Sequence, residues 1–166
     1  MRLLPDFYFK NVCDISAGFL QSEGVRALLL DIDNTLAFDC RPELPESTSR
    51  WLEDMRSAGI KLLIVSNNKE ERTASFAEKC ALPYIASAFK PSARAFLQAQ
   101  GLLGCSAEDC AVVGDQLFTD MAFARRAGCK AVFVEPMGED LQGFVRFKRL
   151  LERPFMKAVR AREVIK

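Results

Sequence analysis

Apolar residues along this chain gather in short runs, and most runs are followed by polar residues and then by a stretch with helical spacing. Four of the runs have the length of a strand and are apolar on both faces, as strands between two layers of helices are. They are residues 25–30, 60–65, 110–113 and 130–134. A weaker and shorter strand is predicted over residues 84–85.

Four stretches between these runs are predicted to be helices. They are residues 45–58, 70–80, 91–100 and 117–127. Gly59 and Gly128 each stand where a helix ends, and Asn68 is available as the cap of a following helix. Because strands and helices alternate, the pattern predicts a doubly wound, three-layer α/β/α sandwich with a mostly parallel, Rossmann-like sheet. Right-handed crossovers then place the carboxyl ends of the strands along one edge.

Length and composition indicate one soluble globular domain over residues 1–166. Of these residues 49% are hydrophobic and 27% are charged. No apolar run has the length of a secretory or membrane-spanning segment, so a cytosolic protein is predicted. Residues 1–24 are predicted as a helical lead-in to a core over 25–135. The apolar residues that suit one face of that lead-in are Phe7, Val12, Ile15, Phe19 and Leu20.

Basic residues are concentrated at the carboxyl end of the chain. Residues 1–145 hold 15 basic and 20 acidic side chains, whereas residues 146–166 hold eight and two, a local charge of +6. Apolar residues are interleaved with these basic ones, which predicts a basic amphipathic helix within residues 136–166. A docked helix with a solvated face is the favoured interpretation, and a surface for anionic lipid or nucleic acid is the alternative.

The ends of the predicted strands carry the polar residues that suggest chemistry. Asp31 and Asp33 follow the first strand, Ser66 the second and Asp115 the third, while Lys90 lies before a helix. The chain has no histidine, which excludes Ser-His-Asp and Cys-His catalysis. Clustered carboxylates are hard oxygen ligands that suit Mg²⁺, and hydroxyl and ammonium groups at helix starts suit phosphate. Together they suggest phosphoryl transfer through an aspartyl-phosphate.

Four of these segments, in this order, resemble the motifs of the haloacid dehalogenase (HAD) phosphatase superfamily. They are Asp31-Ile32-Asp33-Asn34-Thr35, Ser66, Lys90, and Gly114-Asp115 through Asp120. The phrases Val65-Ser66-Asn67-Asn68, Lys90-Pro91 and Leu3-Leu4-Pro5-Asp6 further resemble the YqeG-type branch, a capless group with phosphatidylglycerophosphatase-like members. The resemblance implies a HAD-like fold and a phosphomonoester hydrolase.

The resemblance also implies a role for each residue of the site. Asp31 would attack phosphorus, and Asp33 would protonate the leaving oxygen and then activate water. Mg²⁺ would be held by the side chains of Asp31 and Asp115 and by the backbone carbonyl of Asp33. The phosphoryl oxygens would be bound by Ser66, Asn67 and Lys90. Asn34, Thr35 and Asp120 are predicted around the site, and Asp120 would orient Lys90, orient a metal-bound water, or face solvent.

Spacing predicts a site without a cap domain, because the gaps between the motifs hold little more than a helix and a strand each. An open site accepts a phosphate that protrudes from a large molecule. Within the resemblance the predicted substrate is phosphatidylglycerophosphate, with peripheral contact at the inner membrane face through the basic helix and the apolar segment Phe7-Tyr8-Phe9. The alternatives are a phosphatase of phosphoproteins, nucleotides or sugar phosphates, a receiver-like phosphoacceptor, and a non-catalytic binding module. No nucleic-acid partner is expected, and the oligomeric state is left open.

Overall fold

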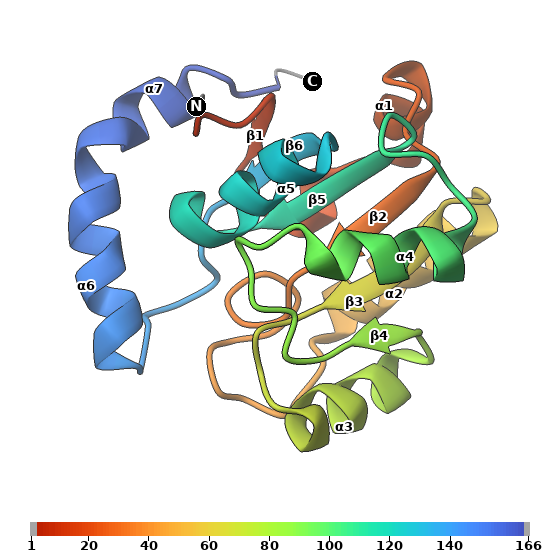
Figure 1. Ribbon diagram of the computed structural model, residues 1–166, viewed down its shortest axis with the longest axis horizontal. Helices are drawn as coiled ribbons and strands as arrows, with labels where there is room; N and C mark the ends of the chain where they lie inside the picture. The colour runs from red at the N-terminus through yellow and green to blue at the C-terminus, as the bar shows by residue number, and fades with distance from the viewer. Residues whose placement is uncertain (1–2, 165–166) are drawn as a thin grey trace.

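The computed structural model describes residues 3–164, and their strands form one six-stranded sheet (Figure 1). Its strand order is β1-β6-β5-β2-β3-β4, and every neighbouring pair is parallel. The strands are β1 Phe7–Phe9, β2 Ala27–Leu30, β3 Lys61–Val65, β4 Tyr84–Ile85, β5 Cys110–Gly114 and β6 Lys130–Val134. The predicted α/β fold with a parallel sheet is confirmed.

Helices cover both faces of the sheet. The α-helices are α1 Ala17–Ser22, α2 Glu46–Ser57, α3 Glu70–Cys80, α4 Arg94–Leu103, α5 Ala122–Ala127, α6 Gly143–Glu152 and α7 Met156–Arg160. Two 3-10 turns, Val12–Asp14 and Arg153–Phe155, and a π-helical turn, Leu117–Met121, complete the described helical elements. None of the helices within residues 3–164 is long and apolar enough to cross a bilayer.

The central strand β2 separates two apolar cores. Leu28 and Leu30 pack in the core beneath α1, α2 and α3, whereas Ala27 and Leu29 pack in the core beneath α4 and α5. This division follows from the two-residue period of a strand, which sends successive side chains to opposite faces. All four residues are fully buried, so the direction of β2 and the position of the residues that follow it are firmly set.

Asp31, Ser66 and Asp115 follow β2, β3 and β5, three adjacent strands of the sheet, and Lys90 follows the edge strand β4. After β2 the chain order of the strands reverses, because β3 lies on one side of β2 and β5 on the other. Ligands of doubly wound sheets bind in the crevice at such a reversal, beyond the carboxyl ends of the strands. The loops that begin at Asp31, Ser66 and Asp115 meet there.

The amino-terminal prediction is wrong where it expected a continuous helix. Phe7–Phe9 form the edge strand β1, which pairs with β6 from Phe7 opposite Val132 to Phe9 opposite Val134. Tyr8 and Phe9 are buried in opposite cores, a two-residue alternation that the helical interpretation missed. The predicted membrane contact through this segment is therefore wrong for Tyr8 and Phe9, because the sheet buries both, and Phe7 is half-buried against Phe19. Residues 1–2 of the predicted lead-in lie outside the described residues.

The basic carboxyl-terminal segment is not one helix, because it breaks at the turn that contains Pro154. Beyond the break, α7 packs on the sheet through the fully buried Val159. The chain then runs beside β1, where the amide of Tyr8 donates to the carbonyl of Arg162 at 3.0 Å. Residues 165–166 of the predicted basic helix lie outside the described residues.

Candidate active site

A buried lysine joins two aspartates at the carboxyl end of β2. Lys90 Nζ lies 2.6 Å from Asp31 Oδ1 and 2.7 Å from Asp120 Oδ1. The Lys90 side chain is 3% exposed, so these ion pairs are sheltered from solvent. Burial alone would lower the pKa of Lys90, but the carboxylates of Asp120 and Asp31 outweigh it and raise that pKa above its usual range. The lysine is therefore a fixed positive charge.

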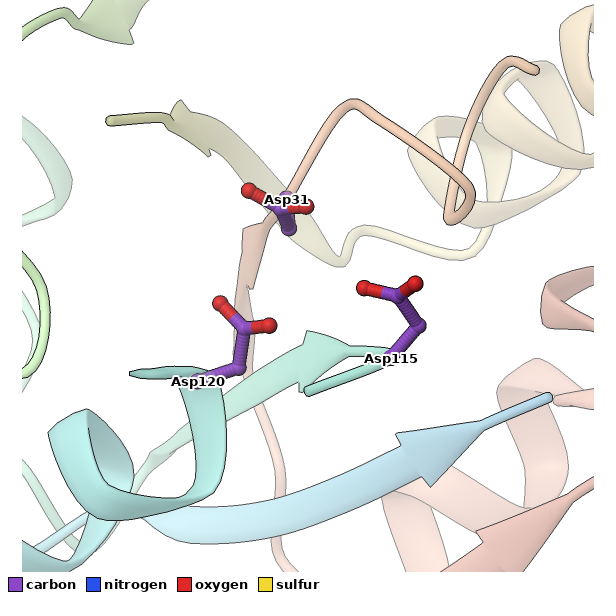
Figure 2. A group of neighbouring side chains, drawn as sticks. All are labelled: Asp31, Asp115 and Asp120. Carbon is purple, nitrogen blue, oxygen red and sulfur yellow. The ribbon is translucent and has the colours of Figure 1, made fainter. Parts of the chain in front are cut away.

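Asp115 completes a group of three buried carboxylates (Figure 2). One oxygen each from Asp31, Asp115 and Asp120 lies within 4.8 Å of the other two. The three side chains come from the end of β2, the end of β5 and the π-helical turn, and they face a common space. Gly114 permits the approach of Asp120, because a Cβ at residue 114 would lie 2.4 Å from Asp120 Cγ.

The negative charge of this group is incompletely compensated. Burial raises the pKa of Asp31 to about 7, although Lys90 pulls it down, and burial raises the pKa of Asp115 well above its usual range. Asp115 Oδ1 is buried and has no hydrogen-bond partner among the described residues, while Oδ2 pairs with Arg149. An orphaned carboxylate oxygen beside two more acids is the donor set that a hard divalent cation requires.

Asn67 sets the position of Lys90 through its backbone. The Lys90 amide donates to Asn67 Oδ1 at 2.7 Å, and Asn67 Nδ2 donates to the Lys90 carbonyl at 3.0 Å. Both backbone groups of Lys90 are bonded to Asn67, so they are not part of a helix. The helix α4 begins at Arg94 instead of at the predicted Pro91. Asn67 lines the cavity, and its side-chain amide is occupied by these two hydrogen bonds.

Asp33 lies in different surroundings from Asp31. Asn68 Nδ2 donates to Asp33 Oδ2 at 2.6 Å, the amide of Cys40 donates to Oδ1 at 3.1 Å, and Arg72 forms an ion pair with the same carboxylate. Asn68 was predicted as a helix cap, but α3 has Lys69 at its N-cap and no side-chain cap bond. The side-chain amide of Asn68 holds Asp33 instead. The Asp33 side chain is 18% exposed and lines the cavity.

The remaining predicted residues divide between the cavity and the core below it. Ser66 lines the cavity, and its Oγ accepts the amide of Asn68 at 3.1 Å, which leaves the hydroxyl proton for another acceptor. Asn34 also lines it and donates to Asp140 at 2.9 Å. Thr35 is fully buried, and its hydroxyl has no partner within residues 3–164.

The cavity above these residues has a volume of about 230 Å³. Pockets that enclose drug-sized ligands measure about 300–1,000 Å³, so this one suits a phosphoryl group and a few adjoining atoms. Its far wall comes from the carboxyl-terminal segment, through Gln142, Phe144, Val145 and Lys148. The expectation of an open site is therefore corrected in one respect. The helix α6 lies on the side of the sheet at which the strands end (Figure 1), and Phe144, Val145 and Lys148 of this helix line the cavity.

Two polar residues attach α6 to the catalytic loops. Arg149 pairs with Asp115 and Asp140, and its guanidinium also donates to the Asp115 carbonyl. Glu152 is buried and accepts the amides of Leu117 and Phe118 at 2.8 and 3.2 Å. In the sequence, Arg149 stands out only as one of the basic residues of the carboxyl-terminal segment. The one available signal was that Arg149 is followed three positions later by the acidic Glu152. This spacing does not show which residues the two side chains contact.

Comparison with known proteins identifies the family. Residues 17–128 match the model of the haloacid dehalogenase-like hydrolases. The chain is also 38% identical over 158 residues to "Probable phosphatase YqeG" of Bacillus subtilis (strain 168), which covers 95% of this chain and 91% of the relative. The chain therefore belongs to the haloacid dehalogenase-like hydrolase family, and the predicted class of enzyme, a HAD-type phosphatase, is confirmed.

A second relative is "Phosphatidylglycerophosphate phosphatase 1, chloroplastic" of Chlamydomonas reinhardtii, 26% identical over 164 residues. The match covers 90% of this chain and 60% of that protein, so the chain spans about three fifths of its length.

Solved structures share the fold. An uncharacterized protein from Listeria monocytogenes serotype 4b has a TM-score of 0.58 at 20% identity, over 72% of this chain and 83% of that one. The cobalt-bound deoxy-D-mannose-octulosonate 8-phosphate phosphatase of Haemophilus influenzae has a TM-score of 0.53 at 14% identity, over 82% and 90%.

Proposed function

We propose that this protein is a Mg²⁺-dependent phosphomonoester hydrolase that works through an aspartyl-phosphate on Asp31. The observation that carries the proposal is the buried group of Asp31, Asp115 and Asp120, with Lys90 between two of its members. A carboxylate nucleophile, a fixed ammonium group and a cation site in one crevice are the parts that phosphoryl transfer requires.

The residues present fit Mg²⁺. The side chains of Asp31 and Asp115 and the backbone carbonyl of Asp33 would hold it, with the unpartnered Oδ1 of Asp115 as a ready ligand. When bound, the ion supplies positive charge beside the transferring phosphoryl group. Asp120 shares Lys90 with Asp31 and accepts the amide of Gln116 at 3.2 Å, so its role is to orient the lysine.

The reaction proceeds in two displacements at phosphorus. A carboxylate oxygen of Asp31 forms a bond to phosphorus while the ester bond breaks, and Asp33 gives its proton to the leaving oxygen. Asp33 then takes a proton from water, which attacks the same phosphorus and releases inorganic phosphate from Asp31. Lys90 and the Ser66 hydroxyl bind the phosphoryl oxygens and stabilise the charge in both transition states.

Asn68 and Arg72 fix the orientation of Asp33 through both of its oxygens. This second carboxylate therefore remains at the cavity while the phosphoryl group is transferred to the first. A receiver-like phosphoacceptor has no need for such a residue, and its presence favours repeated hydrolysis.

We propose phosphatidylglycerophosphate as the substrate. The proposed substrate is supported by the similarity to the Chlamydomonas phosphatidylglycerophosphate phosphatase and by a cavity too small to enclose a whole lipid. A lipid whose acyl chains remain in the bilayer presents only its terminal phosphate, which matches the size of the site. The other candidates are phosphate monoesters of soluble molecules, which the same catalytic group would hydrolyse.

The outer surface of α6 supports contact with an anionic membrane at its cytoplasmic face. Phe144, Phe147 and Leu151 are 73%, 56% and 50% exposed, and they lie on one side of the helix at three- and four-residue spacing. Arg146 and Arg153 are exposed basic neighbours of this stripe. An exposed apolar stripe with flanking cations has the chemistry of a helix that lies in a membrane interface.

The test of the proposed function is phosphate release from a panel that contains phosphatidylglycerophosphate in vesicles, sugar phosphates, nucleotides and a phosphopeptide. We expect the lipid to be the best substrate, activity to disappear with a chelator, and Mg²⁺ to restore it. Asp31→Asn should abolish turnover and leave the thermal unfolding curve unchanged in shape. Release of phosphate by Asp31→Asn would refute the assigned nucleophile, and faster hydrolysis of a soluble monoester would refute the lipid.

A further inference from the structure

Lys148 is a second cation in the wall of the catalytic cavity. The described lysines and arginines that line this cavity are Lys90 and Lys148. Lys148 Nζ donates to Gln116 Oε1 at 2.7 Å and lies 5.2 Å from the centre of the Phe144 ring. The side chain is half-buried, so its ammonium group is held by neighbours and still meets the cavity.

The carboxylates around the cavity are already engaged with other groups. The pairings are Asp31 and Asp120 with Lys90, Asp33 with Arg72, Asp140 with Arg149, and Asp39 with the amide of Leu141. Lys148 has no carboxylate partner within the part of the chain that the structure describes. Its charge is therefore available to an anion that enters from outside.

We propose that Lys148, oriented by Gln116, binds a second anionic group of the substrate, next to the phosphate that is hydrolysed. This inference rests on the proposed function and names the residue that distinguishes its substrate. Phosphatidylglycerophosphate carries such a group, a phosphodiester joined to the terminal phosphate through glycerol. The terminal phosphate occupies Lys90 and Ser66 at the cavity floor, and the diester meets Lys148 at the wall.

The position of Lys148 on α6 fits this role. The residue follows Phe144 by one helical turn and lies between the exposed apolar stripe and the anchored side that carries Arg149. In the lipid, the phosphodiester likewise lies between the acyl chains, which would face the apolar stripe, and the terminal phosphate. Gln116 comes two residues after the end of β5, next to Asp115, so the hydrogen bond to its side-chain amide ties Lys148 to the loop that carries Asp115.

The experiment compares two lipids that differ in the second phosphate. Short-chain phosphatidylglycerophosphate has the diester and the monoester, and phosphatidic acid with the same acyl chains has only the monoester. The measured quantity is the preference, the ratio of kcat/KM for the first lipid to kcat/KM for the second. In Lys148→Met we expect the preference to fall about 10- to 100-fold through KM, as for the loss of one charge-assisted hydrogen bond.

Two further variants make the result specific to charge at this position. Lys148→Arg retains a cation and should keep most of the preference. Lys157→Met removes an exposed charge from the next helix, α7, without touching the cavity and should keep all of it. An unchanged preference in Lys148→Met would overturn the inference.

The kcat/KM values of the native protein for the two lipids distinguish a failure of this inference from a failure of the proposed function. Equal kcat/KM for both lipids in the native protein would overturn the second anion site and leave the phosphatase intact. Hydrolysis of neither lipid would overturn the proposed substrate, and the inference with it.

Discussion

The two acids of the first motif differ in what surrounds them, and this difference fits the separate roles proposed for them. Asp31 is buried against Lys90, while Asp33 is held at the cavity by Asn68 and Arg72. Two carboxylates with separate partners can take separate parts in one reaction. The nucleophile needs a fixed neighbouring charge, whereas the proton carrier needs access to both substrate and water.

Asp33→Asn should separate the two displacements. With p-nitrophenyl phosphate, whose leaving group needs no proton, we expect a burst of nitrophenolate equal to the protein present. Steady turnover should then be about 10²- to 10⁴-fold slower, because the phosphorylated Asp31 lacks its general base. Rapid mixing with absorbance detection measures the burst. Asp31→Asn is the control and should show none, and a burst-free Asp33→Asn with native turnover would contradict the assigned role.

At the scale of elements, α6 has an unusual division of its faces. The side toward the protein is charged and carries Arg149 and Glu152, while Phe144, Phe147 and Leu151 turn to solvent. Surface helices of soluble proteins ordinarily show the reverse division. Ion pairs and hydrogen bonds to the catalytic loops, more than apolar packing, therefore hold this helix in place.

Arg149→Met should destabilise the protein strongly, because it leaves Asp115 and Asp140 without their cation. Breaking a buried ion pair by removing one partner costs about 3–5 kcal/mol. Denaturant unfolding without divalent ions measures the loss, and added Mg²⁺ should reduce it by compensating Asp115. Arg146→Met, an exposed change on the same helix, should alter stability by less than about 0.5 kcal/mol. Equal losses in the two variants would refute the anchoring role.

The edge strand β1 and α7 are joined through Glu135, and the hydrogen bond from Tyr8 to this residue should be visible in the pH dependence of stability. Tyr8 donates to Glu135 at 2.8 Å, and Glu135 also accepts from Arg160 at 2.9 Å. Burial, together with Glu135, raises the pKa of Tyr8 to about 12. The unfolded chain loses this proton near pH 10 and so binds fewer protons than the folded protein. The contribution is complete below pH 10 and is lost as the pH rises toward 12.

Tyr8→Phe isolates this contribution. We expect it to lower the free energy of unfolding by about 1 kcal/mol at neutral pH, as for one hydrogen bond. The difference between native protein and variant should shrink between pH 10 and 12. Urea unfolding of the native protein and the variant at a series of pH values measures it. A difference that stays constant to pH 12 would show that Tyr8 titrates as in the unfolded chain.

At the scale of the whole molecule, the exposed apolar stripe of α6 lies beside the cavity. A membrane that covers this stripe therefore also faces the cavity. Phe147→Ser should weaken binding to vesicles rich in phosphatidylglycerol about 10-fold, since partial burial of a phenylalanine contributes roughly 1.5 kcal/mol. Co-sedimentation measures it, and hydrolysis of a soluble monoester reports the intact site. Leu97→Ser changes an even more exposed apolar residue on α4 and should not affect binding. Equal effects in both variants would refute a specific surface.

The sequence predicted the parts of the molecule that depend on local pattern. The apolar runs located β3 and β6, and the polar residues after β2, β3 and β5 were expected at one edge of the sheet, where they lie, because parallel strands bring their ends together. Two features depend on contacts far along the chain and were not predictable. β1 is a strand because it pairs with β6, and Arg149 is a site residue because it reaches Asp115. Neither periodicity nor composition records such a partner.

The wall that α6 contributes divides the work of the site between two stretches of chain. Residues 31–120 carry every group assigned to the chemistry, and residues 140–152 supply the surface that the rest of the substrate meets. Substitutions in the second stretch can therefore change which phosphate ester is accepted while the reaction itself stays the same. Exchange of this stretch between relatives, with Arg149 and Glu152 retained as its attachment, is a direct way to engineer new selectivity.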